Sequence, residues 1–363
     1  MGSHNESVPT LRWGVIGTGL ISSWFTKDIT ASRKNPRATH IIQAIGSSSL
    51  SKGNAFVSQH LPTLDPAPTV YSDYQSVYND PAVDIVYIGT PHALHKQHCL
   101  DAIAAGKHIL CEKAFTLNAT EAREVLAAAA EKNVFIMEAM WLRFRPLVTS
   151  LRKVLYEEKL IGDVRRVFCD FGLDMNISSL PDSSRLKDPA MGAGSLLDIG
   201  VYALTWGLLT LESPESIPSE KPRIIATQTL RNGIDVASSF ILTYSATGRQ
   251  GILTSTVEVR TPVTFLRIEG TEGYILVEGV GASAPRSYTV YPKINPAAET
   301  VEGKKYEFEV EGSGFYFEAD AVAENIARDE KENEVMPHGE TLRVLEILDE
   351  IRRQGGARFP QEG

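Results

Sequence analysis

Near its N-terminus the chain has a short apolar run that ends in two glycines one residue apart. The run covers residues 13–16, the glycines are Gly17 and Gly19, and a segment compatible with a helix follows at 21–30. This order of strand, glycine turn and helix is typical of a dinucleotide-binding unit. The first glycine permits a tight turn, and the second lets the backbone approach the phosphates at the helix N-terminus. An ordinary strand-to-helix turn has the same pattern, so the interpretation depends on the rest of the chain.

The residues of this turn are the first that we expect to bind a dinucleotide. They are Gly17, Thr18, Gly19, Leu20 and Ile21. The next position is usually a third glycine or an alanine, and here it is Ser22, which is still small enough for the helix and the strand to pack closely.

Length and composition exclude several classes of protein. With 363 residues the chain is long enough for two domains, and its net charge of −9 argues against nucleic-acid binding by bulk electrostatics. No apolar run approaches the roughly 20 residues that span a bilayer, and the polar residues 1–10 lack the apolar core of a secretion signal. Three cysteines are too few for a disulfide framework, so we expect a cytoplasmic protein.

Apolar strands and helical segments alternate over the first 140 residues. The further strands are expected at 40–45, 69–71, 84–89, 107–111 and 134–137, and the further helices include 51–60, 73–78 and 120–132. Such alternation predicts a parallel sheet with right-handed crossovers. We therefore expect an α/β fold with a Rossmann dinucleotide-binding domain at residues 1–143.

The loop after the second strand indicates which dinucleotide binds. A carboxylate there would hold the ribose hydroxyls of NAD and repel a 2′-phosphate. The loop has none and instead presents Ser47, Ser48, Ser49 and Lys52. Hydroxyl groups and a cation favour NADP over NAD, although a plain polar loop before a helix is the alternative.

The fourth strand runs into a segment with a proline and two histidines. Its candidate cofactor residues are Thr90, Pro91, His92 and His95. The proline keeps Thr90 extended, so the chain turns at the carboxyl end of the strand, where ligands bind in doubly wound sheets. Together with His98 the histidines are spaced by three, but such a spacing on one helix does not bring three rings together, and we expect no metal.

The fifth strand delivers Glu112, Lys113 and Ala114. A lysine at the carboxyl end of a parallel strand, beside a glutamate, is well placed to lie over a nicotinamide. Burial can make such a lysine a proton donor or acceptor near neutral pH. A surface Lys/Glu pair at a strand end is the alternative that these residues alone leave open.

With these motifs in order, the chain resembles the Gfo/Idh/MocA family of NAD(P)-dependent sugar and diol dehydrogenases. The matching segments are 17–19, 90–95, 112–114 and 197–202, and residues 137–146 resemble the branch of dimeric trans-1,2-dihydrobenzenediol dehydrogenases and fungal NADP-dependent D-xylose 1-dehydrogenases. Ala114 departs from the proline that usually follows the lysine, which loosens the backbone there. Many relatives have a histidine where this chain has Tyr202, but tyrosine is usual in this branch.

The second domain is expected at residues 144–363, with closing helices that pack back toward the first domain. Residues 144–157 read as a linking helix and 316–328 and 340–352 as closing helices. Strands are expected within 163–175 and at 224–230, 236–244, 251–259, 264–269, 274–278, 287–291 and 306–310. We expect an α+β domain with a large open, mostly antiparallel sheet, and the resemblance implies that its free face forms a homodimer.

The resemblance also implies the chemistry. Lys113 and Tyr202 are the candidates to take the hydroxyl proton, with Lys113 favoured, and Asp198 would orient the substrate or Tyr202, with which it shares a helix face at i and i+4. Residues expected to shape the cofactor and substrate pocket are Glu112, Trp141, Arg143 and Phe144. The implied reaction is NADP-dependent oxidation of D-xylose, a related aldose at C1, or a trans-dihydrodiol.

Two other functions stay open on the same fold. One is a dinucleotide-binding sensor without chemistry, and the other is a glycoside hydrolase that uses bound NAD as a redox catalyst. The presence of both Lys113 and Tyr202 counts against the sensor.

Overall fold

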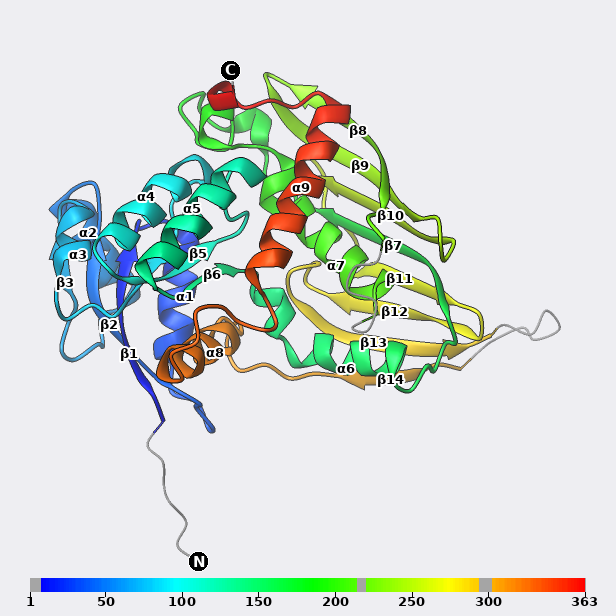
Figure 1. The fold of residues 1–363 in the computed structure, drawn as a ribbon, viewed down its shortest axis with the longest axis horizontal. Coiled ribbons are helices and arrows are strands. Elements are labelled where there is room, and N and C mark those ends of the chain that lie inside the picture. Colours follow the sequence, from blue (N-terminus) through cyan, green and yellow to red (C-terminus); the bar gives the residue numbers. More distant parts are fainter. Residues whose placement is uncertain (1–7, 214–219, 294–301, 363) are drawn as a thin grey trace, which may run out of the picture. The chain divides into compact units, whose positions relative to one another are not determined.

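The computed structural model describes residues 8–213, 220–293 and 302–362, which form two compact units (Figure 1). One unit holds the chain up to Trp141 together with Val310–Leu342, and the other holds Leu142–Glu309 and Arg343–Gly363. The expected boundary at 143/144 lies close to the end of the first unit at Trp141, and the late segment Val310–Leu342 also belongs to this unit. Residues 1–7 of the polar N-terminus lie outside the described residues.

The first unit contains a six-stranded parallel sheet in the order β3-β2-β1-β4-β5-β6. Its strands are β1 Thr10–Ile16, β2 Thr39–Gly46, β3 Thr69–Tyr71, β4 Ile85–Ile88, β5 His108–Glu112 and β6 Ile136–Ala139. The strand order reverses between β1 and β4. In such sheets the carboxyl ends at this switch point form the ligand-binding edge.

Helices alternate with these strands along the chain, which confirms the expected Rossmann fold. They are α1 Leu20–Thr30, α2 Leu50–His60, α3 Gln75–Asn79, α4 His92–Ala104 and α5 Ala119–Lys132. All four residues of β4 are buried. A strand that is covered on both faces loses the alternation of polar and apolar residues, which is why the parallel strands read as continuous apolar runs.

The helix α8, Tyr316–Ala327, belongs to the first unit and is joined to it by two buried acids. Asp28 of α1 accepts hydrogen bonds from the three backbone N–H groups that directly precede α8, at 2.5, 2.9 and 2.7 Å. A carboxylate at this point also interacts favourably with the positive end of the helix dipole. The N-terminus of α8 is therefore capped by a residue nearly 290 positions earlier in the chain.

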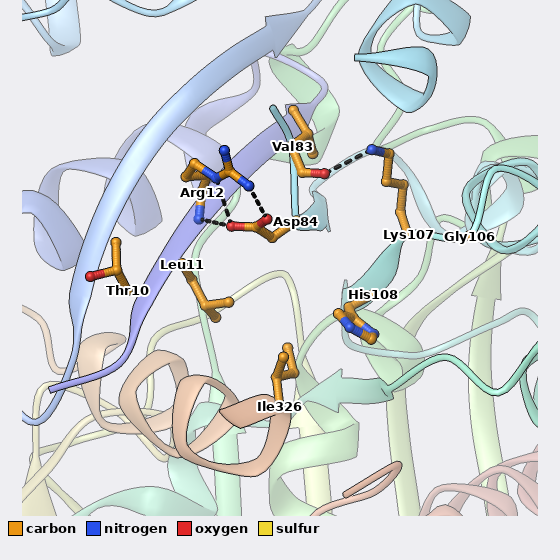
Figure 2. A pocket seen from close by; sticks show the side chains of 9 residues that line it. All are labelled: Thr10, Leu11, Arg12, Val83, Asp84, Gly106, Lys107, His108 and Ile326. Carbon is orange, nitrogen blue, oxygen red and sulfur yellow. Dashed lines mark hydrogen bonds and ion pairs between the residues drawn. The ribbon is translucent and has the colours of Figure 1, made fainter. Parts of the chain in front are cut away.

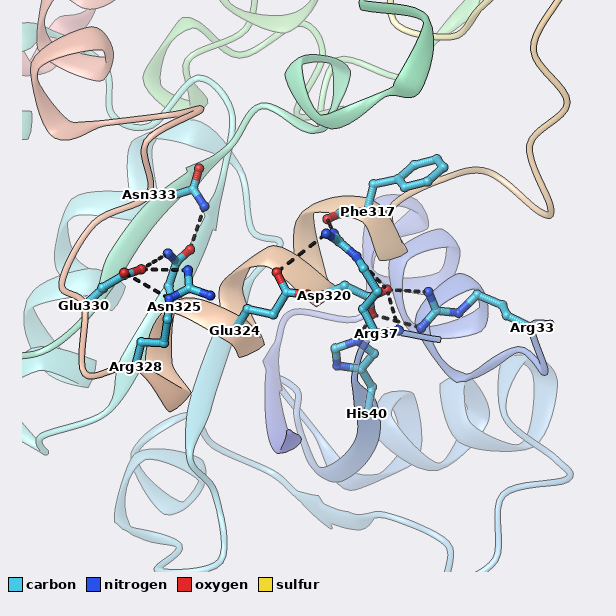
Figure 3. Close-up of polar contacts among 10 residues, drawn as sticks. All are labelled: Arg33, Arg37, His40, Phe317, Asp320, Glu324, Asn325, Arg328, Glu330 and Asn333. Carbon is cyan, nitrogen blue, oxygen red and sulfur yellow. Dashed lines mark hydrogen bonds and ion pairs between the residues drawn. The ribbon is translucent and has the colours of Figure 1, made fainter. Parts of the chain in front are cut away.

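The second acid, Asp320, lies among basic side chains (Figure 3). Arg33 donates to its carboxylate twice, at 2.8 and 3.0 Å, and His40 contacts it at 2.9 Å. Because Trp13 donates to Nδ1 of His40, the ring proton lies on Nε2, which donates to Asp320. Burial opposes ionisation of Asp320, but these bonds outweigh it and lower its pKa.

The second unit contains an eight-stranded sheet in the order β14-β13-β12-β11-β7-β10-β9-β8. The strands are β7 Val164–Gly172, β8 Arg223–Arg231, β9 Ile234–Tyr244, β10 Arg249–Thr256, β11 Thr264–Gly270, β12 Gly273–Gly279, β13 Pro285–Pro292 and β14 Lys304–Glu307. Only the β7–β10 pair is parallel among those described. The expected mostly antiparallel sheet is confirmed, although β14 begins and ends earlier than the predicted strand at 306–310.

Helices of the second unit cover one face of this sheet. Helix α7, Val201–Leu211, packs on β7 and β10, and α6, Pro146–Tyr156, packs on β13. The segment Pro189–Leu211 is long and apolar enough to span a membrane by length and composition, with a mean hydropathy of 1.3 over its most apolar 18 residues, but 94% of those 18 residues are buried inside the protein. Burial against the sheet accounts for its apolar character. The last helix, α9, is His338–Gly355.

Candidate active site

The turn between β1 and α1 is held close to the neighbouring loop. Gly17 has φ of +93°, and its N–H donates to the carbonyl of Gly46 at 3.1 Å. A Cβ at Gly17 would lie 3.1 Å from a methyl group of Thr90 and 3.2 Å from the carbonyl oxygen of Gly89. Both the positive φ and the crowding require glycine at this position.

Gly19 is different, because no contact with the described residues requires glycine at this position. Its φ of −81° is open to any residue, and the nearest atom to an added Cβ would be the carbonyl oxygen of Gly89, at an ordinary 3.8 Å. Gly19 is exposed and precedes α1, whose N-terminus has no side-chain cap. Bare backbone and free N–H groups at a helix start fit a dinucleotide pyrophosphate, so this cradle matches the expected cofactor.

Ser22 packs α1 against the strand end of β4. A Cβ at Gly89 would collide with the Ser22 hydroxyl, which is completely buried and has no hydrogen-bond partner among the described residues. A small side chain at position 22 and glycine at 89 thus allow the close approach of helix and strand. This close packing explains why a small residue is needed at position 22.

Loops that follow four strands contact one another in the same order as the strands. Thr18 lies 3.4 Å from the Ser47 hydroxyl, which joins the loops after β1 and β2. The ring of His95 lies 2.8 Å from the carbonyl of Thr90 and 3.0 Å from that of Ala114, which joins the loops after β4 and β5. The structure therefore brings the predicted cofactor segments of the first unit to one edge of the sheet.

His95 is a buried connector between these loops. It is completely buried, and burial lowers its pKa to about 4 although the surrounding carbonyls favour the protonated ring. The ring is thus neutral at physiological pH. His95 is one of the candidate cofactor residues, and in the structure its ring contacts the backbone carbonyls of Thr90 and Ala114. His92 begins α4 and is also buried.

The loop after β2 gathers hydroxyl groups and a cation at a helix start. Ser49 caps α2 by accepting a hydrogen bond from the backbone of Lys52, and the Lys52 ammonium donates to the Ser48 hydroxyl at 3.1 Å. Ser48 and Lys52 are exposed. Donors and positive charge at a helix N-terminus are suited to an anionic group.

Lys113 is half-buried and follows the last residue of β5. On one side Glu112 is buried and accepts a hydrogen bond from the phenol of Tyr87 at 2.6 Å. On the other side the buried Glu138 accepts from the backbone N–H of Phe115 at 3.2 Å. Residues on both sides of Lys113 are therefore held by hydrogen bonds of buried groups. Glu138 was not among the predicted site residues, although a charged residue inside an apolar strand is a signal that could have identified it.

Three predicted pocket residues lie in the 3₁₀ turn Trp141–Phe144, where the two units meet in the chain. Trp141 ends the first unit, is 8% exposed and stacks on Phe315 with ring centroids 4.3 Å apart. Arg143 and Phe144 begin the second unit and are half-buried.

In the second unit, Asp198 lies in a π-helical turn and Tyr202 lies in the α-helix that follows it. Residues Leu196–Gly200 form a π-helical turn, and α7 begins after it. The predicted helix is present but is not regular throughout, because the π-turn changes the angle between its side chains and those of the next turn. Asp198 is half-buried, and the buried Tyr202 has its ring edge-on to Phe171 at 5.7 Å.

Asp235 of β9 holds the start of this π-turn. Its carboxylate accepts hydrogen bonds from the backbone of Leu196 at 2.8 Å and from the hydroxyls of Ser195 and Ser238 at 2.9 and 2.8 Å. Burial raises the pKa of Asp235 although these bonds oppose the shift. A Cβ at Gly194 would collide with the carboxylate, so the approach to the turn requires glycine. Asp235 was not among the predicted site residues, because the strand was expected to begin at 236 whereas β9 begins at Ile234.

A cavity of about 580 Å³ in the first unit lies at the other edge of the sheet (Figure 2). It is lined by residues at the amino ends of β1, β4 and β5. Its charged groups already have partners, since Arg12 pairs with Asp84 at 2.6 Å and Lys107 donates to two backbone carbonyls at 2.7 Å. We therefore place the candidate site at the carboxyl edge. Among the described residues no group of three or more His, Cys, Asp or Glu side chains is arranged to hold a metal.

Comparison with known proteins decides the family. Residues 11–140 match the Gfo/Idh/MocA model of the oxidoreductase family with an NAD-binding Rossmann fold, and residues 150–276 match the Gfo/Idh/MocA C-terminal domain. The chain belongs to the Gfo/Idh/MocA family of oxidoreductases. The resemblance inferred from its motifs is confirmed.

Two curated relatives match this family member over nearly their full length. D-xylose 1-dehydrogenase (NADP(+)) of Hypocrea jecorina is 34% identical, with 97% of this chain and 94% of the relative covered. Trans-1,2-dihydrobenzene-1,2-diol dehydrogenase of Sus scrofa is also 34% identical, with 97% and 99% covered.

Solved structures confirm the fold at lower identity. A 3-ketoreductase from Actinomadura kijaniata in complex with NADP and TDP-benzene has a TM-score of 0.79 at 21% identity, covering 95% of this chain and 98% of that one. A levoglucosan dehydrogenase in complex with NADH and levoglucosan has a TM-score of 0.80 at 19% identity, covering 96% and 97%.

Proposed function

We propose that this oxidoreductase is an NADP-dependent dehydrogenase that oxidises a CH–OH group of D-xylose, a related aldose at C1, or a trans-dihydrodiol. The observation that carries the proposal is the similarity to one relative that acts on D-xylose and another that acts on a dihydrodiol, each over at least 94% of its length. The two substrate classes share a ring or chain with neighbouring hydroxyl groups. The proposal therefore specifies the reacting group and leaves these two classes to experiment.

The residues at the carboxyl edge would hold the cofactor. The exposed backbone at Gly19 and the N-terminus of α1 would receive the pyrophosphate, and Ser48 and Lys52 would receive the 2′-phosphate of NADP. The loop from Ser47 to Lys52 has no carboxylate to repel that phosphate. Bound NADP⁺ supplies the acceptor for the hydride of the alcohol carbon.

Lys113 would take the proton of the reacting hydroxyl, with Tyr202 as its partner in acid–base chemistry and Asp198 as an orienting group. A half-buried lysine whose flanking residues are held by hydrogen bonds of buried groups is well placed for a general base. Trp141, Arg143, Phe144 and Glu112 would shape the surroundings of cofactor and substrate. This division of roles is what mutation has to test.

The free face of the eight-stranded sheet would form a homodimer, in a cytoplasmic enzyme. Residues of β7, β10, β11 and β12 line a shallow cavity of about 430 Å³ in this sheet, and Arg267 stacks over Phe168 at 4.2 Å. A sheet face of mixed apolar and charged residues suits a twofold interface. Sedimentation or light scattering of the full chain tests it, and a monomer at micromolar concentration contradicts it.

A substrate panel tests the proposed reaction. D-xylose, other aldoses and trans-dihydrodiols are incubated with NADP⁺ or NAD⁺, and reduced nicotinamide is measured by absorbance. We expect turnover with at least one of these classes, with NADP⁺ preferred. Replacing Lys52 by Ala should weaken NADP⁺ about tenfold, the equivalent of about 1.4 kcal/mol, and leave NAD⁺ unchanged. No turnover in the whole panel, or a preference for NAD⁺, contradicts the proposal.

A further inference from the structure

Residues 356–362, which follow the end of α9 at Gly355, are fixed to the second unit and are called the C-terminal strap below. The buried ring of Phe359 lies under the Arg352 guanidinium, 4.4 Å from the ring centroid. The same buried arginine donates to both carboxylate oxygens of Glu362, at 2.7 and 2.8 Å. A bidentate pair of this kind adds geometric specificity as well as energy. The strap therefore has a defined position.

The strap contacts the segment that leads to the π-turn. Gln361 donates from its side-chain amide to the backbone carbonyl of Ala190 at 2.6 Å, and Ala190 lies in the 3₁₀ turn Pro189–Met191. Only a few residues separate that turn from Leu196, where the π-turn begins. The last turn of the strap, Pro360–Glu362, lies beside this segment in Figure 1.

A second link runs from the strap through Gln228 of β8. The side-chain oxygen of Gln228 accepts the backbone N–H of Ala357 at 3.2 Å, and its amide donates to the Ser238 hydroxyl at 2.9 Å. Ser238 donates in turn to Asp235, the acid that holds the first residues of the π-turn. An unbroken chain of printed donors and acceptors thus joins the strap to the turn that carries Asp198.

Two glycines at the end of α9 make this second link possible. A Cβ at Gly355 would collide with the side chain of Gln228, so only glycine lets the helix end come this close. Gly356 has φ of +95°, a conformation that turns the chain out of the helix and into the strap. The helix end therefore delivers the N–H of Ala357 to the Gln228 oxygen.

We propose that Gln228 and the C-terminal strap are positioning elements that hold the π-turn, and with it Asp198, in place for substrate binding. The inference rests on the proposed role of Asp198 as the group that orients the substrate. The two links end on opposite sides of Gly194, at Ala190 and at the Asp235 anchor of Leu196, so they fix both ends of a short glycine-containing approach. Loss of one link loosens the turn and weakens substrate binding. The cofactor cradle at Gly19 belongs to the first unit and keeps its affinity for NADP⁺.

Hydrogen–deuterium exchange of the ligand-free protein tests the link, with Gln228→Met as the variant and Gln354→Met as its matched control. Gln354 also joins α9 to β8, through backbone groups of Ala226 and Ile224, but it is not part of the chain to the π-turn. Amides of residues 194–200 should exchange about tenfold faster in Gln228→Met, as expected for the loss of about one net hydrogen bond. In Gln354→Met they should exchange as in wild type. Wild-type exchange in Gln228→Met, or equal acceleration in both variants, overturns the proposal.

A second variant does not depend on the folding of Gln228→Met. Gln361→Ala removes an exposed side chain and only the link to Ala190. With the substrate found in the panel, its KM should rise about fivefold while kcat and the Kd for NADP⁺ stay within about twofold of wild type. An unchanged KM, or a loss confined to kcat, overturns the proposal. Failure of the proposed reaction is seen separately, because the panel then shows no turnover while the faster exchange in Gln228→Met persists.

Discussion

The loops around Lys113 and the π-turn around Asp198 carry the proposed catalytic residues, but different chemistry holds them in place. In the first unit a neutral His95 contacts backbone carbonyls of two loops. In the second unit Asp235 accepts three donors around the π-turn. One anchor is a buried base and the other a buried acid. Burial disfavours the charged form of both, so their contributions to stability respond to pH in opposite directions.

The directions of the two pKa shifts determine how each residue's contribution to stability changes with pH. The pKa of His95 is lowered by burial, so its contribution is present above about pH 6.5 and is lost as pH falls toward about 4. The pKa of Asp235 is raised by burial, so its contribution is present at acidic pH and is lost as pH rises through the raised value. If the stability contribution of either His95 or Asp235 does not depend on pH in this way, the contrast between the two anchors is wrong.

The largest expected effect is on the acid anchor. Asp235→Leu leaves three buried donors without their acceptor, which should lower the free energy of unfolding by about 3 kcal/mol or more. Asp235→Asn keeps an acceptor oxygen and is the matched control, with a smaller loss. Urea unfolding of wild type and both variants measures it. A leucine variant within about 1 kcal/mol of wild type would show that Asp235 does not hold the turn.

The second largest effect that we expect is the pH dependence of the stability that His95 contributes. A shift from about 6.5 to about 4 corresponds to about 3 kcal/mol of stability that wild type loses on acidification across that window. His95→Gln cannot titrate and still donates to a carbonyl, so its stability should lack this component. Unfolding free energies of the two proteins at a series of pH values give the difference. Parallel curves would mean that His95 titrates normally.

The smallest expected effects are those of alanine substitutions at Gly17 and Gly19, which should differ from each other. Gly17→Ala is crowded at positive φ and should lower stability by about 1 kcal/mol or more. Gly19→Ala should leave stability unchanged and weaken NADP⁺ about tenfold, because the side chain would occupy the space for the phosphates. Thermal unfolding and titration with NADP⁺ measure the two quantities. If Gly19→Ala binds NADP⁺ as tightly as wild type, the pyrophosphate does not bind at this turn.

The parallel sheet and the loops at its edge were predictable because each depends on local sequence. Apolar runs, glycines and Pro91 mark where strands end, and strand ends in a parallel sheet lie at one edge. The central place of β7 in the second sheet was not predictable, because it is set by long-range pairing with β10 and β11. For the same reason His95 and Asp235 acquire their roles only through contacts with distant residues. Whether a polar side chain is buried depends on the folded structure and cannot be read from the residues next to it in the sequence.

The most direct test of the account is Lys113→Met. The variant keeps the length of the side chain and removes the amine, so it should fold and bind NADP⁺ with a Kd within about threefold of wild type. Its turnover with the best substrate of the panel should fall by a factor of about 10² to 10⁴, the usual contribution of a general acid–base group. Near-normal turnover by a correctly folded, NADP-binding Lys113→Met protein would contradict the account.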